Sequence, residues 1–385
     1  MTYNKTVEKG NLSMTELEKN KKAELKTEKR KKRIKMMVIV MVVLFVVVIV
    51  IFAGAWNMFG EKINAAKCIH SLEEGLYYLE YKGDYGFDAF IEQGGAESDA
   101  DMAVYITEFL SNGFYHGDGN SVEKDFGCSS LCVGTSFGSQ LMGRNFDWEK
   151  CNAIIVHTVP DNGYESISTC NIEFLGFGEG WKPEGMVNQY MALAAIYVPL
   201  DGMNEKGLCV ADLINGDEEE THQQSGKADL TTVSAIRLLL DKAATVDEAI
   251  ALLSKYDMNS SIGTAHHLAV SDADGNSVVV EYVNNEMVVT KTPIVTNHYL
   301  SDGEKFGIGN EESHKRYDTL LSIWQNNGGI MEAETLQEVM EVVSYPDITQ
   351  WSIIYDKTNR TVDFYWQRQY DAVHHFEIGA DSRKK

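Results

Sequence analysis

Gly127-Cys128-Ser129-Ser130, followed by Gly143-Arg144-Asn145-Phe146-Asp147-Trp148, is the stretch that decides the fold. Arg144 and Asp147 lie 16 and 19 residues after Cys128. Between the two motifs, apolar residues alternate with small or polar ones and a glycine-serine pair interrupts them, as is typical of a β-hairpin. The stretch therefore predicts a hairpin with a cysteine at its start and an Arg-x-x-Asp pair on its second strand.

Cys128 is a candidate nucleophile, and its own α-amino group is the most compact base that could activate the thiol. Such an amine titrates at about 7.7–8.0 and a free thiol at about 8.5, so proton transfer between them is nearly balanced near neutral pH. The amine exists only after the bond between Gly127 and Cys128 is cut. Glycine lacks a Cβ and tolerates a strained backbone, which suits self-cleavage by the neighbouring thiol.

The order Cys128, Arg144 and Asp147 resembles the nucleophile hairpin of the cysteine N-terminal-nucleophile hydrolases of the choloylglycine hydrolase and acid ceramidase type, also called linear amide C-N hydrolases. Gly-Cys-Ser-Ser also looks like the start of the penicillin-forming acyltransferases in the same superfamily. The resemblance extends from residue 128 to about residue 366. It implies an α+β fold, an αββα sandwich of four layers, in a catalytic domain over 128–385.

A second match is Gly202-Met203-Asn204-Glu205-Lys206-Gly207-Leu208, which is similar to a run in the choloylglycine hydrolases. In the family the following strand leads to an asparagine that helps to form the oxyanion hole. Ile214 occupies that place here, and Asn215 follows one residue later. A slip of one residue reverses the face of a strand, so either a bulge restores Asn215 as an oxyanion donor or the second donor differs.

Two more residues match the family. Asn297 ends the strand Pro293-Ile294-Val295-Thr296 and matches the main oxyanion asparagine, and Arg316 matches a second active-site arginine near the start of a helix. A neutral amide aimed at a tetrahedral oxygen is worth on the order of 3–4 kcal/mol at comparable sites.

The resemblance implies a complete set of roles. The Cys128 thiolate attacks an amide carbonyl, its liberated amine is the general base, and water hydrolyses the resulting acyl-thioester. Asp147 would bind the amine, Arg144 would favour the thiolate, and Arg316 would steady the developing charge. No metal or organic cofactor is implied. The substrate would be a small-molecule linear amide: bile-salt conjugates, N-acyl amines, penicillins and acyl-homoserine lactones all fit.

Two alternatives stay open. An acyltransferase would pass the acyl group to an amine in place of water, as the Gly-Cys-Ser-Ser beginning suggests. A chain that is never cut could instead be a non-catalytic, acidic surface-binding protein, which the missing asparagine at position 214 allows.

Charge divides the chain sharply. Residues 1–35 contain 12 Lys and Arg against 5 Asp and Glu, a net charge of +7, whereas the remaining residues carry a net charge of −30. A body this acidic repels phosphate backbones, which excludes nucleic-acid binding as a function class.

Residues 36–56 contain no charged side chain and are rich in Val and Ile, long enough to cross a bilayer core of about 30 Å. The basic residues 29–35 before them favour a cytoplasmic amino terminus. We expect a basic cytoplasmic tail over 1–35, a transmembrane signal anchor over 36–56 and an extracytoplasmic catalytic domain. Ala53-Gly54-Ala55 has the form of a signal-peptidase site, but the apolar run exceeds the about 7–15 residues usual for a signal peptide.

Residues 57–127 are expected to form a helical pro-segment that resembles the small subunit of acid ceramidase. Apolar residues recur at helical spacing over 63–78 and again over 103–110, and Gly117 to Ser121 form a loop before the proposed cut. Downstream, residues 151–200 are mainly strand-like, two helices start near Val233 and at the Thr245 cap, and strands follow over 267–290. Asp272 to Gly275 are read as a hairpin turn, since the downstream glutamate of a calcium loop is missing.

All six cysteines follow the apolar segment, where disulfides are permitted. None shows zinc-like Cys-x-x-Cys spacing, and six cysteines allow 15 pairings, so no pairing is assigned. A helix starting near Ser313, another from Thr335 and a final pair of strands over 349–366 complete the expected α+β body.

Overall fold

A computed structural model describes residues 8–113, 127–178, 180–217 and 219–379, with side chains from residue 16 onward. The loop expected at Gly117 to Ser121 lies outside these residues. The chain divides into two compact units, Met1–Gly60 and Glu61–Lys385, and each is described by itself.

The first unit is helical. Helix α1 runs over Glu8–Cys68, and its last turns belong to the second unit. By length and composition it is the one helix in the described part of the chain that could cross a membrane, a test that a signal sequence also passes. Its most apolar window has no buried residue, which distinguishes it from the core helix of a globular domain.

The larger sheet of the second unit has nine strands. Its neighbours are antiparallel except for β2 and β5, which pair in parallel from Leu76↔Ala153 to Lys82↔Val159. The strands, in spatial order, are β1 (His70–Glu73), β2 (Leu76–Lys82), β5 (Ala153–Val159), β6 (Ser166–Asn171), β7 (Asp201–Asn204), β8 (Cys209–Ile214), β11 (His266–Ser271), β12 (Ser277–Val283) and β13 (Glu286–Lys291).

The smaller sheet has six antiparallel strands and contains the expected hairpin. Its spatial order is β14 (Ile294–Val295), β3 (Gly127–Gly134), β4 (Gln140–Asp147), β15 (Thr349–Asp356), β16 (Thr361–Trp366) and β17 (Val373–Glu377). A short parallel pair, β9 (Asp229–Thr231) and β10 (Asp257–Asn259), lies apart from both sheets.

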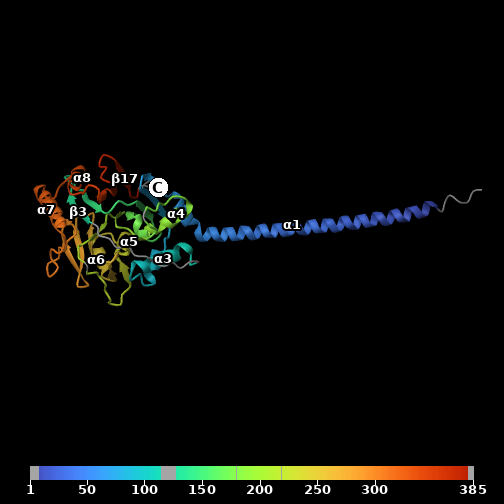
Figure 1. The fold of residues 1–385 in the computed structure, drawn as a ribbon, viewed down its shortest axis with the longest axis horizontal. Helices are drawn as coiled ribbons and strands as arrows, with labels where there is room; N and C mark the ends of the chain where they lie inside the picture. The colour runs from blue at the N-terminus through green and yellow to red at the C-terminus, as the bar shows by residue number, and fades with distance from the viewer. Residues whose placement is uncertain (1–7, 114–126, 179, 218, 380–385) are drawn as a thin grey trace, which may run out of the picture. The chain divides into compact units, whose positions relative to one another are not determined.

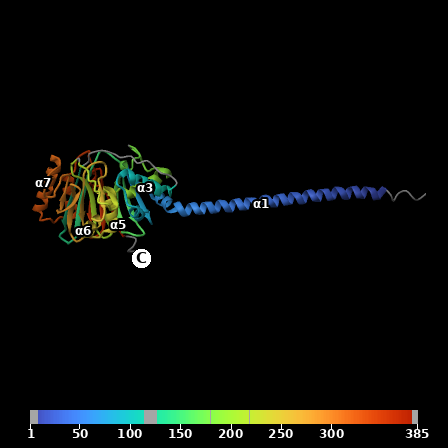
Figure 2. The ribbon, with the colours of Figure 1, turned by 90° about the horizontal axis from the view of Figure 1, so that it is seen from below.

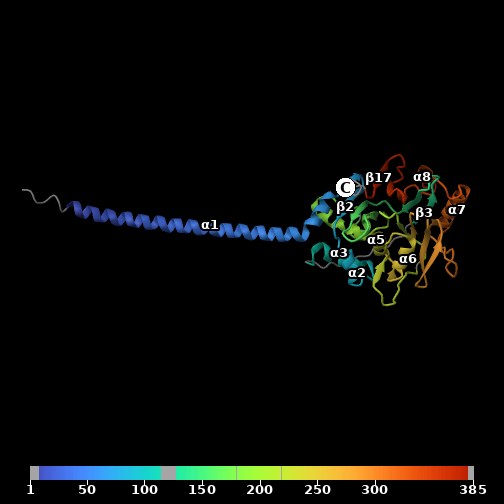
Figure 3. The same ribbon diagram turned by 180° about the vertical axis from the view of Figure 1, so that it is seen from behind.

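Helices cover the outer faces of both sheets. Helices α5 (Thr232–Lys242) and α6 (Val246–Leu253) pack on β7, β8, β11 and β12, while α7 (Glu311–Asn326) and α8 (Ala333–Val342) pack on β3, β4, β14 and β15. Strand β3 also contacts β8, so the two sheets face each other. The body is therefore a mixed α+β structure with two sheets between two helical layers, and α7 and α3 (Asp99–Ser111) lie on opposite sides of it (Figure 1, Figure 2, Figure 3).

Alternation along β3 places the cysteine between the sheets. Cys128 and Cys132 belong to the large core between the two sheets, whereas Leu131 and Val133 belong to the core beneath α7 and α8. The two faces of β3 thus pack into two different hydrophobic cores, as expected for a strand that is buried on both sides.

The segment before the proposed cut is not wholly helical, so the expectation for 63–78 is wrong beyond Cys68. Strands β1 and β2 occupy residues 70–82, followed by α2 (Phe87–Glu92) and α3, which was expected. In β2, Tyr77, Leu79 and Tyr81 are buried at every second residue, as in a strand, and Leu76 is buried as well. The parallel pairing with β5, distant in sequence, decides in favour of the strand.

Smaller differences concern helices. Residues 172–197, expected to be strand-like, form η1 (Ile172–Leu175), α4 (Met186–Met191) and η2 (Ala192–Tyr197). Helix α7 begins after the Asn310 cap, and α8 begins two residues before Thr335, with no side-chain cap. The Thr245 cap and the turn between β11 and β12 are confirmed.

Candidate active site

The hairpin of β3 and β4 brings the nucleophile candidate beside the acidic member of its motif. The register pairs Gly127 with Asp147 and Cys128 with Phe146. Gly127 does not have a positive φ, so backbone strain is not the reason for a glycine here. A Cβ at Gly127 would instead lie 3.3 Å from Asp147 Oδ2 and 3.5 Å from Arg316 Nη2, which is crowded. The glycine thus admits two charged groups close to the 127–128 bond.

The backbone nitrogen of Cys128 binds Asn297, and a hydrogen-bond network continues from Asn297 to Arg316 and Asp147. It donates a hydrogen bond to Asn297 Oδ1 at 2.6 Å, and Arg316 Nη2 donates to the same oxygen at 2.7 Å. Arg316 Nη1 lies 2.5 Å from Asp147 Oδ2, and Thr349 Oγ1 donates to Asp147 Oδ1 at 2.5 Å. All of these side chains are buried, so each charged group depends on its partners in place of water.

The thiol of Cys128 lies in a different environment. Cys128 is fully buried in the continuous chain, and burial raises the pKa of its thiol to about 12, while Arg144 opposes that rise. Asp147 and Asp212 raise the pKa further. The thiol of the uncut chain is therefore protonated and sealed between the sheets at neutral pH.

Arg144 is fully buried beside this thiol. Its Nη1 donates to the carbonyl of Asn145 at 2.5 Å and its Nη2 to the carbonyl of Asp212 at 2.8 Å. Its Nε lies 3.5 Å from Asp201 Oδ2, an ion pair that is too long for a well-formed hydrogen bond. The guanidinium is thus oriented by two backbone carbonyls and one carboxylate.

Asp201 was not predicted as a site residue. Its carboxylate is fully buried and accepts hydrogen bonds from Trp351 Nε1 at 3.1 Å and from the Tyr355 hydroxyl at 3.0 Å. Burial raises its pKa, which Arg144 counteracts. The sequence did contain a signal for Asp201. It directly precedes Gly202 in the matched run and lies on a strand with little other charge, and a buried carboxylate needs a partner.

The second oxyanion candidate is not restored by a bulge. Strands β8 and β11 pair in regular register up to Ile214↔His266, and Asn215 follows the end of β8. Asn215 is fully buried, and its side-chain atoms make no hydrogen bond of good geometry with the described residues, although it lies close enough to Tyr299 to affect the pKa of that hydroxyl. Asn297 Nδ2 donates to the carbonyl of Ile214 at 2.6 Å. In the continuous chain, therefore, Asn297 Oδ1 accepts two hydrogen bonds and Nδ2 donates one to the backbone.

A buried contact between His267 and Glu281 supports the loop that carries Asn297. His267 Nδ1 lies 3.0 Å from Glu281 Oε1, and His267 Nε2 lies 2.8 Å from the carbonyl of Thr296. Glu281 also accepts from the backbone nitrogens of Leu300 and Ser301 at 2.9 and 2.7 Å. These contacts fix both ends of the segment around Asn297.

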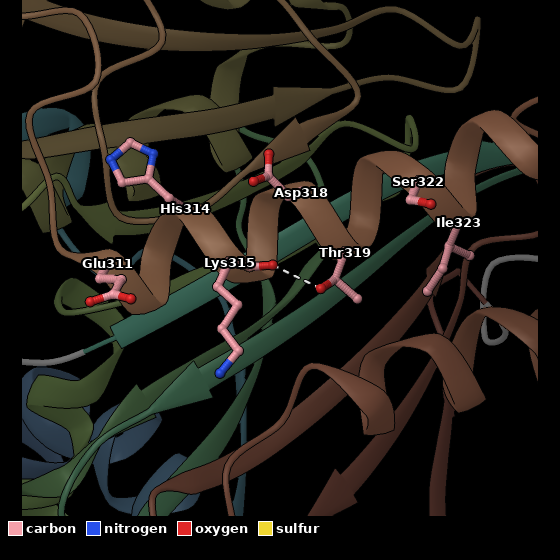
Figure 4. Close-up of a pocket in the computed structure, with 7 residues that line it drawn as sticks. All are labelled: Glu311, His314, Lys315, Asp318, Thr319, Ser322 and Ile323. Carbon is pink, nitrogen blue, oxygen red and sulfur yellow. Dashed lines mark hydrogen bonds between the residues drawn. The ribbon is translucent and has the colours of Figure 1, made fainter.

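A surface groove of about 660 Å³ lies along α7 and is lined by none of the expected site residues (Figure 4). Its lining consists of Glu311, His314, Lys315, Asp318, Thr319, Ser322 and Ile323. The figure shows all seven side chains on one helix. Elsewhere in the described residues, no group of three or more His, Cys, Asp or Glu side chains is arranged to hold a metal ion. The six cysteines are free thiols in this structure.

Comparison with known proteins matches a segment that contains Cys128, Arg144, Asp147 and Asn297 but ends before Arg316. Residues 128–299 match the family model of the linear amide C-N hydrolases, choloylglycine hydrolase family. A penicillin V acylase of Pectobacterium atrosepticum is 31% identical over 99 residues, which are 23% of this chain. The chain spans about a quarter, 26%, of the length of that curated relative. The resemblance found in the sequence is thereby confirmed.

Solved structures give weaker matches. A mutant conjugated bile acid hydrolase from Clostridium perfringens is 16% identical with a TM-score of 0.47, and covers 65% of this chain and 92% of its own. A penicillin V acylase from Agrobacterium tumefaciens is 17% identical with a TM-score of 0.44, and covers 66% of this chain and 87% of its own.

Proposed function

We propose that this chain, whose residues 128–299 match the family model of the linear amide C-N hydrolases, choloylglycine hydrolase family, is a member of that family and hydrolyses a small-molecule linear amide through Cys128. On this proposal the body is an N-terminal-nucleophile hydrolase sandwich of the αββα type. Self-cleavage between Gly127 and Cys128 would release the amine that acts as the base.

The observation that carries the proposal is the convergence on Cys128 of residues from separate parts of the chain. Arg144 and Asp147 come from β4, Asn297 follows β14, and Arg316 lies in α7. A buried arginine, carboxylate and amide around one backbone nitrogen cost desolvation energy, which a purely structural core seldom retains.

The hydrogen bonds around that nitrogen suit an amine as well as an amide. After cleavage, the nitrogen of Cys128 would keep Asn297 Oδ1 as an acceptor and would have Asp147 nearby. The amine takes the thiol proton, and the thiolate attacks the carbonyl carbon of the substrate. The C–S bond then forms, the C–N bond breaks, and the leaving amine takes the proton. Water attacks the thioester, its proton passes to the amine, and the acid leaves as the thiol is restored.

The test combines mass spectrometry with an amide panel. Purified protein should show a new amino terminus at Cys128 and should release amines from at least one panel member, whereas Cys128→Ala should do neither. Cys132→Ala is the matched control, because it removes a buried thiol from the same strand. An intact chain with full amidase activity would refute the mechanism, and an intact, inactive chain would favour the non-catalytic alternative. Adding amines and analysing products separates hydrolase from acyltransferase.

We also propose that residues 36–56 anchor the protein, with the amino terminus cytoplasmic and the catalytic body outside. The uncharged run and its basic flank support this topology. Protease added to intact cells should digest the body and spare an epitope at the amino terminus. Full protection of the body would contradict the orientation, and recovery of a soluble body that lacks residues 36–56 would indicate a cleaved signal peptide.

A further inference from the structure

A second buried ion pair lies next to the proposed nucleophile, and the function proposed above does not use it. Asp212 in β8 and His266 in β11 face each other with Oδ1 and Nδ1 2.8 Å apart, and their side chains are only 2% and 4% exposed. The backbone carbonyl of Asp212 is the oxygen that receives Arg144 Nη2. The pair is therefore one hydrogen bond away from the arginine beside the thiol.

The hydrogen bonds of His266 define its charge. Its Nε2 lies 2.9 Å from the backbone carbonyl of Ser261, and because a carbonyl oxygen only accepts, Nε2 must carry a hydrogen. Nδ1 faces the Asp212 carboxylate, which also accepts. Both ring nitrogens therefore donate, and His266 is an imidazolium. The pKa of His266 is raised, because Asp212 outweighs the opposing effect of burial.

The position of the Ser261 carbonyl depends on helix α3, which precedes the proposed cut. Asp99, in the first turn of α3, accepts from Ser261 Oγ at 2.8 Å and from the backbone nitrogen of Ile262 at 2.9 Å. Ile262 has a φ of +46°, a left-handed conformation that is unfavourable for a β-branched residue. Asp99 therefore stabilises a turn that would otherwise relax, and its negative charge also favours the imidazolium.

The charges around the thiol explain what this arrangement does. Arg144 favours the thiolate of Cys128, whereas Asp147 and Asp212 oppose it. A positive His266 neutralises Asp212, so that less of the field of Arg144 is cancelled at the sulfur. The charged groups that face this region are Cys128 from β3, Arg144 and Asp147 from β4, Asp201 from β7, Asp212 from β8, His266 from β11 and Asp99 from α3.

We propose that Asp212 and His266 are positioning residues for the Arg144–Cys128 pair, and that Asp99 sustains them from the segment before the cut. The inference rests on the proposed function of Cys128. It assigns to that segment a continuing role in the electrostatics of the processed site, because Asp99 would lie on one product of the cleavage and His266 on the other.

The experiment measures the iodoacetamide alkylation rate of Cys128 in processed protein as a function of pH, with the amino-terminal peptide quantified by mass spectrometry. His266→Gln should shift the profile to higher pH by about 0.5–1 unit, because Asp212 is left unneutralised. Asp212→Asn should shift it to lower pH, and the double variant should return close to the wild-type profile. Loosened packing alone would not shift the pH profiles of His266→Gln and Asp212→Asn in opposite directions.

Asp99→Asn provides a milder variant in case the buried substitutions prevent folding. It should shift the profile in the direction of His266→Gln by a smaller amount. Asp101→Asn, on the exposed face of the same helix, should leave the profile unchanged. His375→Gln is a second control, because it breaks a His–Asp pair at the surface, His375 with Asp363.

Two results would overturn the inference while leaving the proposed function intact. One is a wild-type protein that is processed and alkylated at Cys128, with all variants sharing its profile. The other is a shift of the same sign in Asp212→Asn and His266→Gln. If the wild-type protein neither cuts itself nor shows a reactive Cys128, the proposed function fails, and the inference fails with it.

Discussion

The surroundings of the Cys128 backbone nitrogen (the nitrogen side) and those of its thiol (the sulfur side) differ in how well they suit catalysis in the continuous chain. Around the nitrogen, Asn297, Arg316 and Asp147 form a chain of hydrogen bonds of 2.5–2.7 Å. Around the sulfur, burial raises the thiol pKa to about 12. The comparison indicates that the continuous chain already assembles groups that would bind a liberated amine, whereas burial keeps the Cys128 thiol protonated near neutral pH.

The largest expected effect is the difference in thiol reactivity between uncut and processed chains. With a pKa of about 12, the thiolate fraction at pH 8 is about 10⁻⁴, and deprotonation increases only as the pH approaches 12. A processed Cys128 with a pKa near the ordinary value should react at least about a thousandfold faster. Brief iodoacetamide labelling of a partly processed sample measures both forms, because their tryptic peptides differ in mass. Equal labelling rates of the cut and uncut forms would contradict the expected difference in thiol reactivity.

Asp147→Asn should disrupt the hydrogen-bond network on the nitrogen side of Cys128. The substitution leaves the buried Arg316 guanidinium without its carboxylate, and breaking a buried pair in this way costs about 3–5 kcal/mol. We expect kcat/KM and the rate of self-cleavage to fall by about 10³-fold. Thr349→Val is the control, because it removes one hydrogen bond to Asp147 but keeps the charge. Its loss should be about tenfold or less, and a matching loss would argue against a special role for the charge.

Asn297→Ala tests the amide of the nitrogen side and should lower kcat/KM by about 10²–10³-fold, in the range of a lost oxyanion donor. Asn297→Asp keeps an acceptor for the nitrogen of Cys128 but loses the donor to Ile214, so it separates the two uses of the amide. Asn215→Ala is the comparison variant. Were it to cost as much as Asn297→Ala, the main donor would have been assigned to the wrong asparagine.

The smallest effect is expected on the sulfur side, from Asp201→Asn. The carboxylate of Asp201 lies 3.5 Å from Arg144 Nε, and its loss should lower kcat/KM by about tenfold because the guanidinium is then less firmly oriented toward the sulfur. Tyr355→Phe removes only one hydrogen bond to Asp201 and should cost about 0.5–1.5 kcal/mol in the free energy of unfolding, measured by denaturant titration. Activity that is unchanged in Asp201→Asn would show that backbone carbonyls alone suffice to orient Arg144.

The sequence predicted the parts of the site whose signals are local. The hairpin of β3 and β4 follows from alternation and a turn, and the spacing of Arg144 and Asp147 to Cys128 is fixed within twenty residues. Asn297 and Arg316 were found through motif order; in the structure Asn297 binds the nitrogen of Cys128, and Arg316 binds the same oxygen of Asn297.

The sequence could not reveal the parts that depend on distant partners. Residues 63–78 were expected to be helical, but β1 and the first residues of β2 occupy the end of that range, and β2 pairs with β5, which is distant in sequence. Asp212 and His266 lie in strands with no local motif, and only the pairing of β8 with β11, in which they are diagonal neighbours, brings the two side chains together. A charged residue inside an otherwise apolar strand such as Cys209–Ile214 is nevertheless a signal worth following, since its partner must exist somewhere in the fold.

Strand β2 carries one more consequence. Its seven residues pair along their whole length with β5, so breaking the chain at Cys128 would produce two polypeptides that share one sheet. Dissociation of such a nicked protein would require all the hydrogen bonds between β2 and β5 to break, because β1 and β2 form one edge of the sheet and belong to the first polypeptide. We therefore expect the two fragments to co-purify in mild detergent and to separate only in denaturant.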